Sequence, residues 1–359
     1  MTRPAVRSAK GWVRDAVRRA PPYASGGGQA PIRLDRNESP EELAPDLRED
    51  VLRRLASQPW SRYADPWAEE LRERLAAREN LAPEAVLVGN GSNALILSLF
   101  VALAAPDRRI AILPPTFGLY EPWIRATGME PVLFPLDEDS LLPAADRIVA
   151  AAEADPELAV LICSPNNPTG TLFPRSGLEA ILATGALVVV DEAYVEFSKS
   201  SARDLLATNP NLILLRTFSK AAALAGARVG YVIADPEFVS ELVKVVPPFA
   251  VNLFGRAAAL SLLSDEARLS ARIAGIVSER DRLLGELARM AGARRSDSRA
   301  NFVYLRPERT AVELHEELRR RGVLVRRVAG TMGADALRVT VGKPDENDAF
   351  LEAWKEVTA

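Results

Sequence analysis

The stretch Arg216-Thr-Phe-Ser-Lys220-Ala-Ala-Ala-Leu-Ala-Gly-Ala-Arg228-Val-Gly-Tyr231 is the most informative part of this 359-residue chain. It places one lysine directly after small hydroxyl residues and one arginine eight residues later. An amine condenses with the aldehyde of a cofactor, and hydroxyls with a planar guanidinium hold that cofactor's phosphate. The segment therefore predicts a Schiff-base lysine beside a phosphate site. A lysine and an arginine on a solvated loop are the alternative.

The composition is that of an ordinary folded protein. Hydrophobic residues make up 48% of the chain and charged residues 26%, as in typical globular domains. The 45 basic and 48 acidic side chains give a net charge of −3, so no overall field attracts nucleic acid or an anionic membrane surface. We therefore expect neither nucleic acid nor a membrane as a partner.

The single cysteine, Cys163, cannot form an internal disulfide, which favours a reducing, cytoplasmic compartment. No apolar run reaches the length needed to span a membrane. The first 20 residues are basic but lack the apolar core of a secretory signal. We expect them to form an arm with a short helix that ends at Pro21-Pro22.

Short aliphatic and β-branched runs alternate with helical patterns through most of the chain. The run Leu187-Val-Val-Val-Asp191 is apolar throughout, as in a strand that helices cover on both faces. This alternation predicts an α/β fold with a mostly parallel sheet, whose sites lie at the carboxyl ends of strands. The predicted strands are 86–89, 109–113, 131–134, 158–163, 187–191, 212–216 and 229–233, with helices such as 94–104 and 119–127 between them.

The alternation stops after residue 256, and the chain is long enough for two domains. We predict a large cofactor-binding domain over 46–256 and a small α+β domain formed by 1–45 and 257–359. In the second part we expect a long helical stretch (255–291), strands (301–305, 323–327 and 336–341) and a helix (310–321).

Three motifs follow predicted strands and offer groups for a cofactor. Gly89-Asn-Gly91-Ser92-Asn93 opens a helix whose amides could bind an anion; a plain turn is the alternative. Pro114-Pro-Thr-Phe117-Gly-Leu-Tyr120 offers an aromatic ring for a flat cofactor, or for the core. Ser164-Pro-Asn166-Asn167-Pro168-Thr-Gly170 offers amides for a phenolic oxygen, or serves only the turn.

Asp191-Glu192-Ala193-Tyr194 ends the most apolar predicted strand. A carboxylate is costly to bury there without a partner. The protonated nitrogen of a pyridine ring is a suitable partner, because the pair keeps the ring able to accept electrons. A structural salt bridge is the alternative for Asp191. Together with the lysine segment, these motifs supply the groups that pyridoxal phosphate chemistry requires.

The chain resembles the fold type I aminotransferases, and most closely the histidinol-phosphate aminotransferase family. The lysine segment and Asp191-Glu192-Ala193-Tyr194 are specific for the cofactor and less so for the substrate. The resemblance implies a mostly parallel seven-stranded sheet sandwiched by helices, with a smaller α+β domain. It runs almost end to end and rests on the segments 34–40, 62–66, 164–170, 190–197, 216–220, 300–303 and 337–342.

The resemblance also implies roles for single residues. Lys220 would form the internal aldimine and carry the proton between the substrate α-carbon and the cofactor, and Asp191 would pair with the pyridine nitrogen. Tyr194 and Asn167 would face the phenolic oxygen, and Phe117 would stack on the ring. The phosphate site would comprise Gly91, Ser92, Asn93, Thr217, Ser219 and Arg228, with Tyr63 from the second subunit of a homodimer.

For the substrate, the resemblance implies that Arg338 binds the α-carboxylate and that Tyr23 and Arg326 bind a substrate phosphate, with Asn37 nearby. The implied reaction is a ping-pong transfer of an amino group between histidinol phosphate and 2-oxoglutarate. Tyr23 as an anchor of the arm and Arg326 as a solvated cation are the alternatives.

Two departures from the family pattern leave the substrate open. Asn93-Ala94 stands where the family has Asp-Glu, and Arg326-Arg327-Val328 stands where it has Arg-Asp-Arg. A paralogue for aromatic or other amino acids is therefore an alternative. An enzyme similar to threonine-phosphate decarboxylase, an amino-acid oxidase and the effector domain of a transcription regulator are the others.

Overall fold

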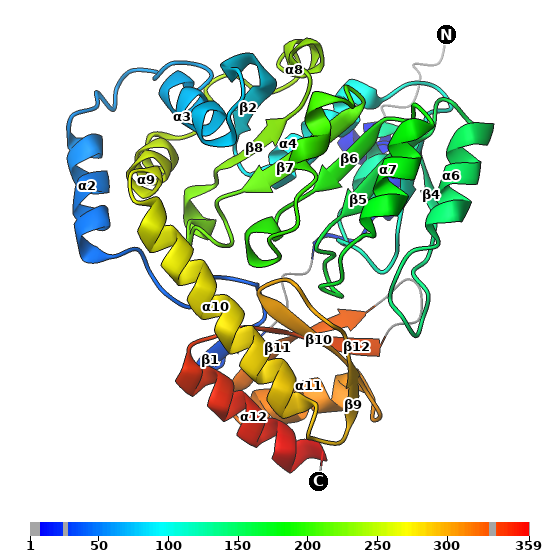
Figure 1. The fold of residues 1–359 in the computed structure, drawn as a ribbon, viewed down its shortest axis with the longest axis vertical. Helices are drawn as coiled ribbons and strands as arrows, with labels where there is room; N and C mark the ends of the chain where they lie inside the picture. The colour runs from blue at the N-terminus through cyan, green and yellow to red at the C-terminus, as the bar shows by residue number, and fades with distance from the viewer. Residues whose placement is uncertain (1–7, 24–27, 330–334, 359) are drawn as a thin grey trace.

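The computed structural model describes residues 8–23, 28–329 and 335–358. Two β-sheets dominate it, and each has its own apolar core. In Figure 1 the larger sheet fills the upper body, and the smaller sheet lies below it. Among the described residues, no helix combines the length and the apolarity needed to cross a membrane.

The large sheet contains seven strands in the order β2-β8-β7-β6-β5-β3-β4. β8 runs antiparallel to both of its neighbours, and the other pairs are parallel. The predicted strands are confirmed to within one or two residues. They are β2 (Val86–Gly89), β3 (Arg109–Ile112), β4 (Glu130–Leu133), β5 (Ala159–Cys163), β6 (Val188–Asp191), β7 (Leu212–Thr217) and β8 (Gly230–Ile233).

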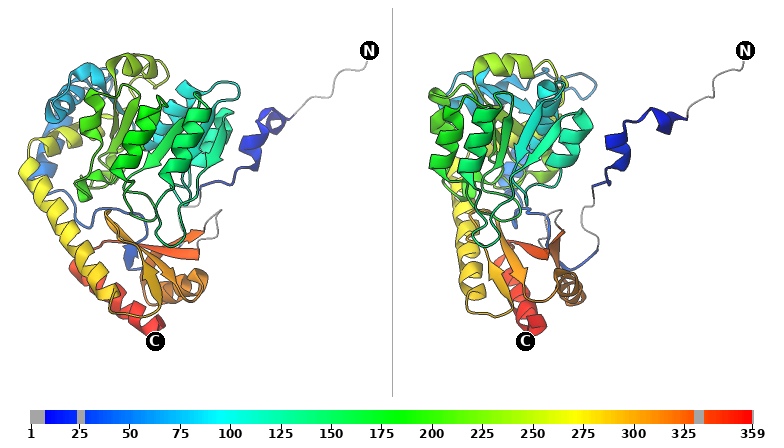
Figure 2. Two further views of the ribbon diagram at one scale, coloured as in Figure 1. Left: turned by 45° about the vertical axis from the view of Figure 1, so that its right-hand side comes forward. Right: turned by 90° about the vertical axis from the view of Figure 1, so that its right-hand side faces the viewer.

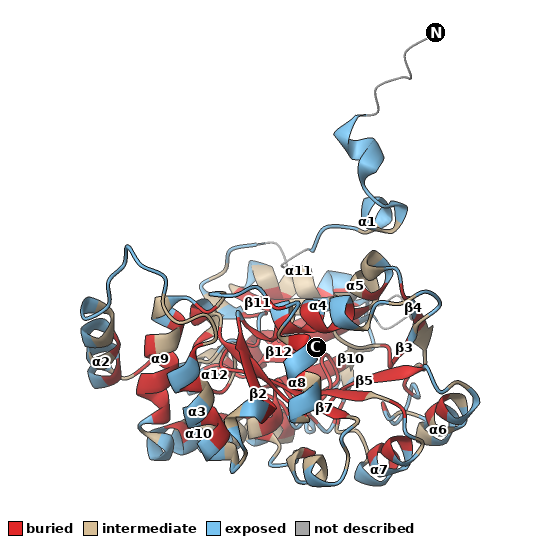
Figure 3. Ribbon diagram, turned by 90° about the horizontal axis from the view of Figure 1, so that it is seen from above, coloured by how far each residue is buried: buried red, intermediate tan, exposed pale blue. Residues whose placement is uncertain are grey.

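Helices cover both faces of this sheet, which explains why its central strands are apolar on both sides. Figure 3 shows the buried strands between the flanking helices. One face packs against α4 (Ser92–Leu103), α5 (Tyr120–Thr127) and α8 (Pro236–Leu242). The other packs against α2 (Pro45–Ala56), α3 (Glu69–Glu79), α6 (Ala145–Ala154), α7 (Arg175–Ala183) and α9 (Leu253–Leu263).

The small sheet has the order β1-β11-β12-β10-β9. Apolar side chains from three helices and this sheet form its core. The strands are β1 (Ile32–Leu34), β9 (Ala293–Arg295), β10 (Phe302–Pro307), β11 (Val323–Ala329) and β12 (Asp335–Thr340), and the helices are α10 (Glu266–Leu287), α11 (Ala311–Arg320) and α12 (Pro344–Thr358). β1 pairs with β11 in parallel, so the segment after the arm joins a sheet built from the end of the chain.

The helical stretch predicted over 255–291 is confirmed for most of its length and consists of two helices, α9 and α10. The second helix begins where the side chain of Asp265 accepts the Arg268 backbone N–H. The arm helix α1 (Asp15–Arg19) ends before Pro21, as predicted. It contacts α5 of the large sheet, where Arg14 Nη1 donates to the Ala126 carbonyl at 2.8 Å. Figure 2 shows the arm extending from the body. The domain boundaries at residues 46 and 257 stay a prediction.

Candidate active site

A cleft of 890 Å³ lies between the two sheets. It is lined by residues at the carboxyl ends of β5, β6 and β7 in the large sheet and by residues in or next to β1, β11 and β12 in the small sheet. This is the position where open α/β sheets carry their sites. Most of the residues that the sequence singles out line it. They are Tyr23, Asn37, Ser92, Asn93, Phe117, Asn167, Asp191, Tyr194, Thr217, Ser219, Lys220, Arg228, Arg326 and Arg338.

Lys220 projects into this cleft from the segment after β7. Its Nζ donates to the main-chain carbonyl of Arg36 at 3.1 Å. Burial and then the positive charge of Arg338 lower the pKa of the Lys220 amine to about 7. An amine with this pKa is neutral in a large fraction of molecules near pH 7, which is the form that attacks an aldehyde.

Asp191 lies at the last position of β6 and is buried. Its Oδ2 accepts from the Tyr120 hydroxyl at 2.6 Å and its Oδ1 from the Ala193 backbone N–H at 3.1 Å. Burial raises the pKa of this carboxyl group. Asp191 has no ion pair with any residue that the structure describes, so a structural salt bridge does not explain it. A cationic ring nitrogen would complete its environment.

Tyr194 and Asn167 both line the cleft, and each is held by a hydrogen bond from a neighbouring side chain. The Asn37 amide Nδ2 donates to the Tyr194 hydroxyl at 3.0 Å. Arg338 Nη1 donates to Asn167 Oδ1 at 2.6 Å, which leaves the Asn167 amide NH₂ as a donor. A phenolic oxygen placed between Tyr194 and Asn167 would therefore meet suitable donors.

A cluster of hydrogen-bond donors lies at the start of α4. Arg228 Nη1 donates to Ser219 Oγ at 3.1 Å, and Thr217 Oγ1 donates to the same oxygen at 3.0 Å. Gly91 precedes the helix with φ +80°, and a Cβ there would lie 2.5 Å from Arg228 Nη2. The absence of a side chain at Gly91 thus lets the guanidinium reach the helix N-terminus. Hydroxyls, a guanidinium and terminal N–H groups are the donors that bind phosphate.

Two arginines line the cleft from the small sheet. Arg326 and Arg338 are partners in the register between β11 and β12, so their side chains leave the same face of the sheet. The Arg326 guanidinium lies 6.0 Å from the centre of the Tyr23 ring, within the range of a cation–π contact. Arg338 Nη2 donates to the Asp35 carbonyl at 2.9 Å, and burial lowers the pKa of Arg338.

Tyr63 lies apart from these residues. Its side chain is 84% exposed and stacks on Phe249, with ring centres 4.7 Å apart. It does not line the cleft of its own chain. Tyr63 therefore does not reach the phosphate site of its own chain, and its predicted contact with the site of a second subunit stays a prediction.

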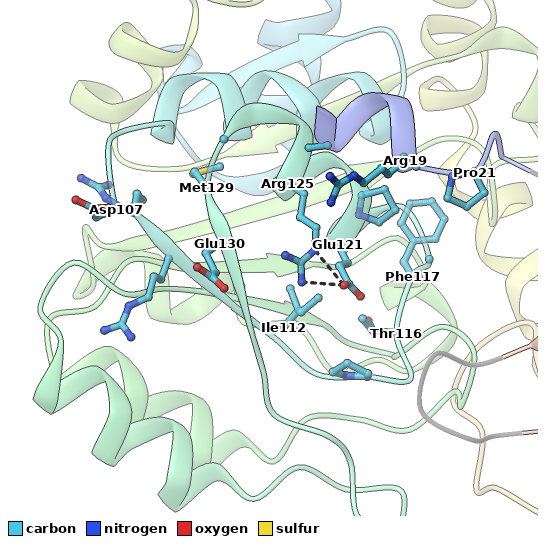
Figure 4. Close-up of a pocket in the computed structure, with 18 of the residues that line it drawn as sticks. Arg19, Pro21, Asp107, Ile112, Thr116, Phe117, Glu121, Arg125, Met129 and Glu130 are labelled. Atoms are coloured by element: carbon cyan, nitrogen blue, oxygen red, sulfur yellow. Dashed lines mark hydrogen bonds and ion pairs between the residues drawn. The ribbon is translucent and has the colours of Figure 1, made fainter. Parts of the chain in front are cut away.

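A larger cavity of 1220 Å³ adjoins the cleft beneath the arm and shares Thr116 and Phe117 with it. Figure 4 shows its lining, in which Arg125 and Glu121 point toward each other. They form an ion pair at 3.2 Å, and Arg109 similarly pairs with Asp155 at 2.6 Å. These four charged side chains of the lining are thus engaged in ion pairs with one another.

Two features of the site were not predicted from the sequence. Tyr120 stands in a motif that the sequence singles out, three residues after Phe117, yet no role was predicted for it. The contacts of Arg36 and Asp35 use main-chain carbonyls, which residue types do not reveal. Position within the aromatic motif was the only signal for Tyr120.

The donor set of the cleft fits pyridoxal phosphate. Lys220 would meet its aldehyde, Asp191 its ring nitrogen, and Arg228 with its hydroxyl neighbours would meet its phosphate. The shape constraint at Gly91 supports this fit, since only a residue without a Cβ permits the approach of Arg228.

Comparison with known proteins agrees with this chemistry. Residues 30–353 match the family described as aminotransferase class I and II. Histidinol-phosphate aminotransferase of Thermococcus kodakarensis is 40% identical over 351 residues, covering 96% of this chain and 99% of that protein. Histidinol-phosphate aminotransferase 1 of Carboxydothermus hydrogenoformans is 38% identical over 346 residues, covering 96% and 98%. A crystal structure titled putative histidinol-phosphate aminotransferase, from Erwinia carotovora, superposes with a TM-score of 0.84 at 27% identity, covering 93% and 100%.

Proposed function

The chain belongs to the class I and II aminotransferases, and we propose that it is the pyridoxal-phosphate-dependent histidinol-phosphate aminotransferase of histidine biosynthesis. Its relatives of 38–40% identity that carry this name match nearly the whole chain. The observation that carries the substrate proposal is the cross-strand pair Arg326 and Arg338, which lines the cleft from the small sheet. Two guanidinium groups there suit a second phosphate, distinct from that of the cofactor.

Pyridoxal phosphate, when bound, supplies an aldehyde that condenses with amines and a ring that accepts electrons. Lys220 would provide the amine and, with a pKa of about 7, would accept the proton that leaves the substrate α-carbon and deliver it to the cofactor carbon that carried the aldehyde. The Asp191 carboxylate would keep the ring nitrogen protonated. Asn167 and Tyr194 would bind the phenolic oxygen, and Phe117 would stack on the ring.

The substrate would enter at the arginine end of the cleft. Arg338 and Arg326 would bind the phosphate of histidinol phosphate, with the Tyr23 hydroxyl beside them. In the second half of the ping-pong cycle, Arg338 would bind a carboxylate of glutamate or of 2-oxoglutarate. Its hydrogen bonds to Asn167 and to the Asp35 carbonyl hold the guanidinium in place for both. Asn37 would act on the substrate indirectly, because its side-chain amide donates a hydrogen bond to the Tyr194 hydroxyl.

We also propose a homodimer with shared active sites, in which Tyr63 contacts the cofactor phosphate of the second subunit. The exposed Tyr63–Phe249 stack supports this arrangement, because large aromatic rings exposed on a surface are typical of interfaces. A cytoplasmic location is a further proposal that rests on the single cysteine; cell fractionation tests it.

Steady-state kinetics with 2-oxoglutarate test the substrate proposal. Histidinol phosphate should give a kcat/KM at least about 100-fold above that of histidinol, since the comparison removes only the phosphate and its charge-assisted contacts. Faster turnover of aromatic amino acids would indicate a paralogue. Release of carbon dioxide from threonine phosphate would indicate a decarboxylase, and oxygen consumption would indicate an oxidase.

A further inference from the structure

Tyr120 lies behind the cofactor cleft rather than in it. It is the first residue of α5, its side chain is fully buried, and it does not line the cleft. Its hydroxyl lies 2.6 Å from Asp191 Oδ2. The edge of its ring also packs against Phe117, with ring centres 5.3 Å apart. Tyr120 therefore contacts two residues of the site without touching the space for a ligand.

The Tyr120 hydroxyl acts as a donor. Burial, with the neighbouring Asp191 carboxylate and Cys163 thiol, raises the pKa of this hydroxyl well above its ordinary value, so the proton stays on the phenol. The Ala193 N–H binds the second carboxylate oxygen. Each oxygen of Asp191 thus accepts one hydrogen bond and keeps a lone pair for another donor.

The Tyr120 hydroxyl and the Ala193 N–H stabilise the ionised state of Asp191. A carboxylate in a dry environment tends to take up a proton, and hydrogen bonds to its charged form oppose this. They also fix the plane of the carboxyl group, because one donor binds at each oxygen. The directions of the remaining lone pairs are then fixed by these two contacts before any ligand arrives.

We propose that Tyr120 is a positioning residue that keeps Asp191 ionised and oriented toward the ring nitrogen of pyridoxal phosphate. The proposal rests on the cofactor pairing in the proposed function and is independent of the substrate. The other titratable groups that face Asp191 are Cys163 at the end of β5, Glu192 and Tyr194 on its own segment, and Lys220 after β7. None of them changes in the test that follows.

The test compares Tyr120→Phe with the wild type by equilibrium binding of two probes to the apoprotein between pH 5 and 9. One probe is pyridoxal phosphate, and the other is its analogue with CH in place of the ring nitrogen. The matched control is Tyr304→Phe, which removes a buried hydroxyl that has no partner among the described residues. No substrate is present, so failure of the substrate proposal does not affect the result.

For Tyr120→Phe we expect about tenfold weaker binding of pyridoxal phosphate at pH 7, the range of a charge-assisted hydrogen bond. The deficit should grow toward low pH, because Asp191 without the hydroxyl takes up a proton at a higher pH. The analogue should bind Tyr120→Phe and wild type equally. Tyr304→Phe should match wild type for both probes.

An equal loss for pyridoxal phosphate and for the analogue would overturn the proposal, because it would mean that Tyr120 acts only through packing on Phe117. Unchanged binding of pyridoxal phosphate at every pH would also overturn it.

If Tyr120→Phe does not fold, 3-fluorotyrosine at position 120 gives the same test, since it retains the ring and strengthens the donor. The low-pH loss of affinity should then move to lower pH, and a profile identical to wild type would contradict the proposal. If wild type itself does not bind pyridoxal phosphate, the proposed function fails instead.

Discussion

Arg326 of β11 and Arg338 of β12 stand directly opposite each other in the small sheet. Like charges at opposite cross-strand positions are unfavourable, and Arg338 is also buried. A ligand with at least two negative charges would reverse this cost. Both arginines line the cleft from the small sheet, whereas Arg228 lines it from the segment before β8 of the large sheet. The small sheet therefore supplies the charges that a phosphorylated substrate would need.

Replacing Arg326 should affect the phosphorylated substrate selectively. Arg326→Gln should lower kcat/KM for histidinol phosphate by about 100-fold, as expected when a charged contact to phosphate is lost. The glutamate half of the cycle should change by less than about tenfold, because Arg338 retains the carboxylate contact. Arg294→Gln, an exposed arginine paired with Asp139, is the control. Equal losses for both substrates would argue against a phosphate role for Arg326.

The Lys220 amine should react according to its ionisation. Because its pKa is about 7, the neutral fraction rises as the pH increases through 7 and then levels off. The rate at which apoprotein forms a covalent link with pyridoxal phosphate should follow this curve, measured by stopped-flow absorbance. Lys220→Met should form no such link and should lose at least about 10³-fold in transamination. A rate that still rises steeply above pH 9 would indicate an ordinary, solvated lysine.

Mixed dimers should reveal which subunit supplies Tyr63 to each active site. Lys220→Ala and Tyr63→Ala chains are each impaired alone. Co-expression should restore about a quarter of wild-type activity, because half of the dimers are mixed and each has one complete site. If Tyr63 serves the site of its own chain, mixing restores nothing. Light scattering on the purified protein provides the control for dimer formation.

Gly91 should be intolerant of a side chain. Gly91→Ala places a Cβ against Arg228 at a positive φ, and both effects should weaken binding of pyridoxal phosphate by at least about tenfold. Gly226→Ala is a matched control in the neighbouring loop, because its Cβ would meet nothing within 4 Å. Affinity by fluorescence titration compares the two. Equal affinities would place the phosphate elsewhere.

The sequence predicted the large sheet well for a physical reason. Its strands are short runs of aliphatic residues buried on both faces, such as β6, and that pattern is local. β1 and β9, with three residues each, carry no such signal. β1 forms because it can pair with β11, nearly three hundred residues away. The division between α9 and α10 depended on a single capping residue, Asp265.

The site was predictable where function requires a particular side chain. The roles proposed for Lys220, Asp191 and Arg228 each restrict the residue type, and the structure brings these residues into one cleft. Tyr120 was missed because its role depends on a contact with Asp191, seventy-one residues away in the chain. The carbonyl of Arg36 was missed because any residue supplies it.

The most direct test of the proposed function is a half-reaction without a keto acid. Protein loaded with pyridoxal phosphate is mixed with histidinol phosphate, and the absorbance of the bound cofactor is followed. We predict stoichiometric conversion of the cofactor to its amine form, with glutamate also active and histidinol nearly inactive. A cofactor spectrum that histidinol phosphate leaves unchanged, while another amino acid converts it, would contradict the assignment of this substrate.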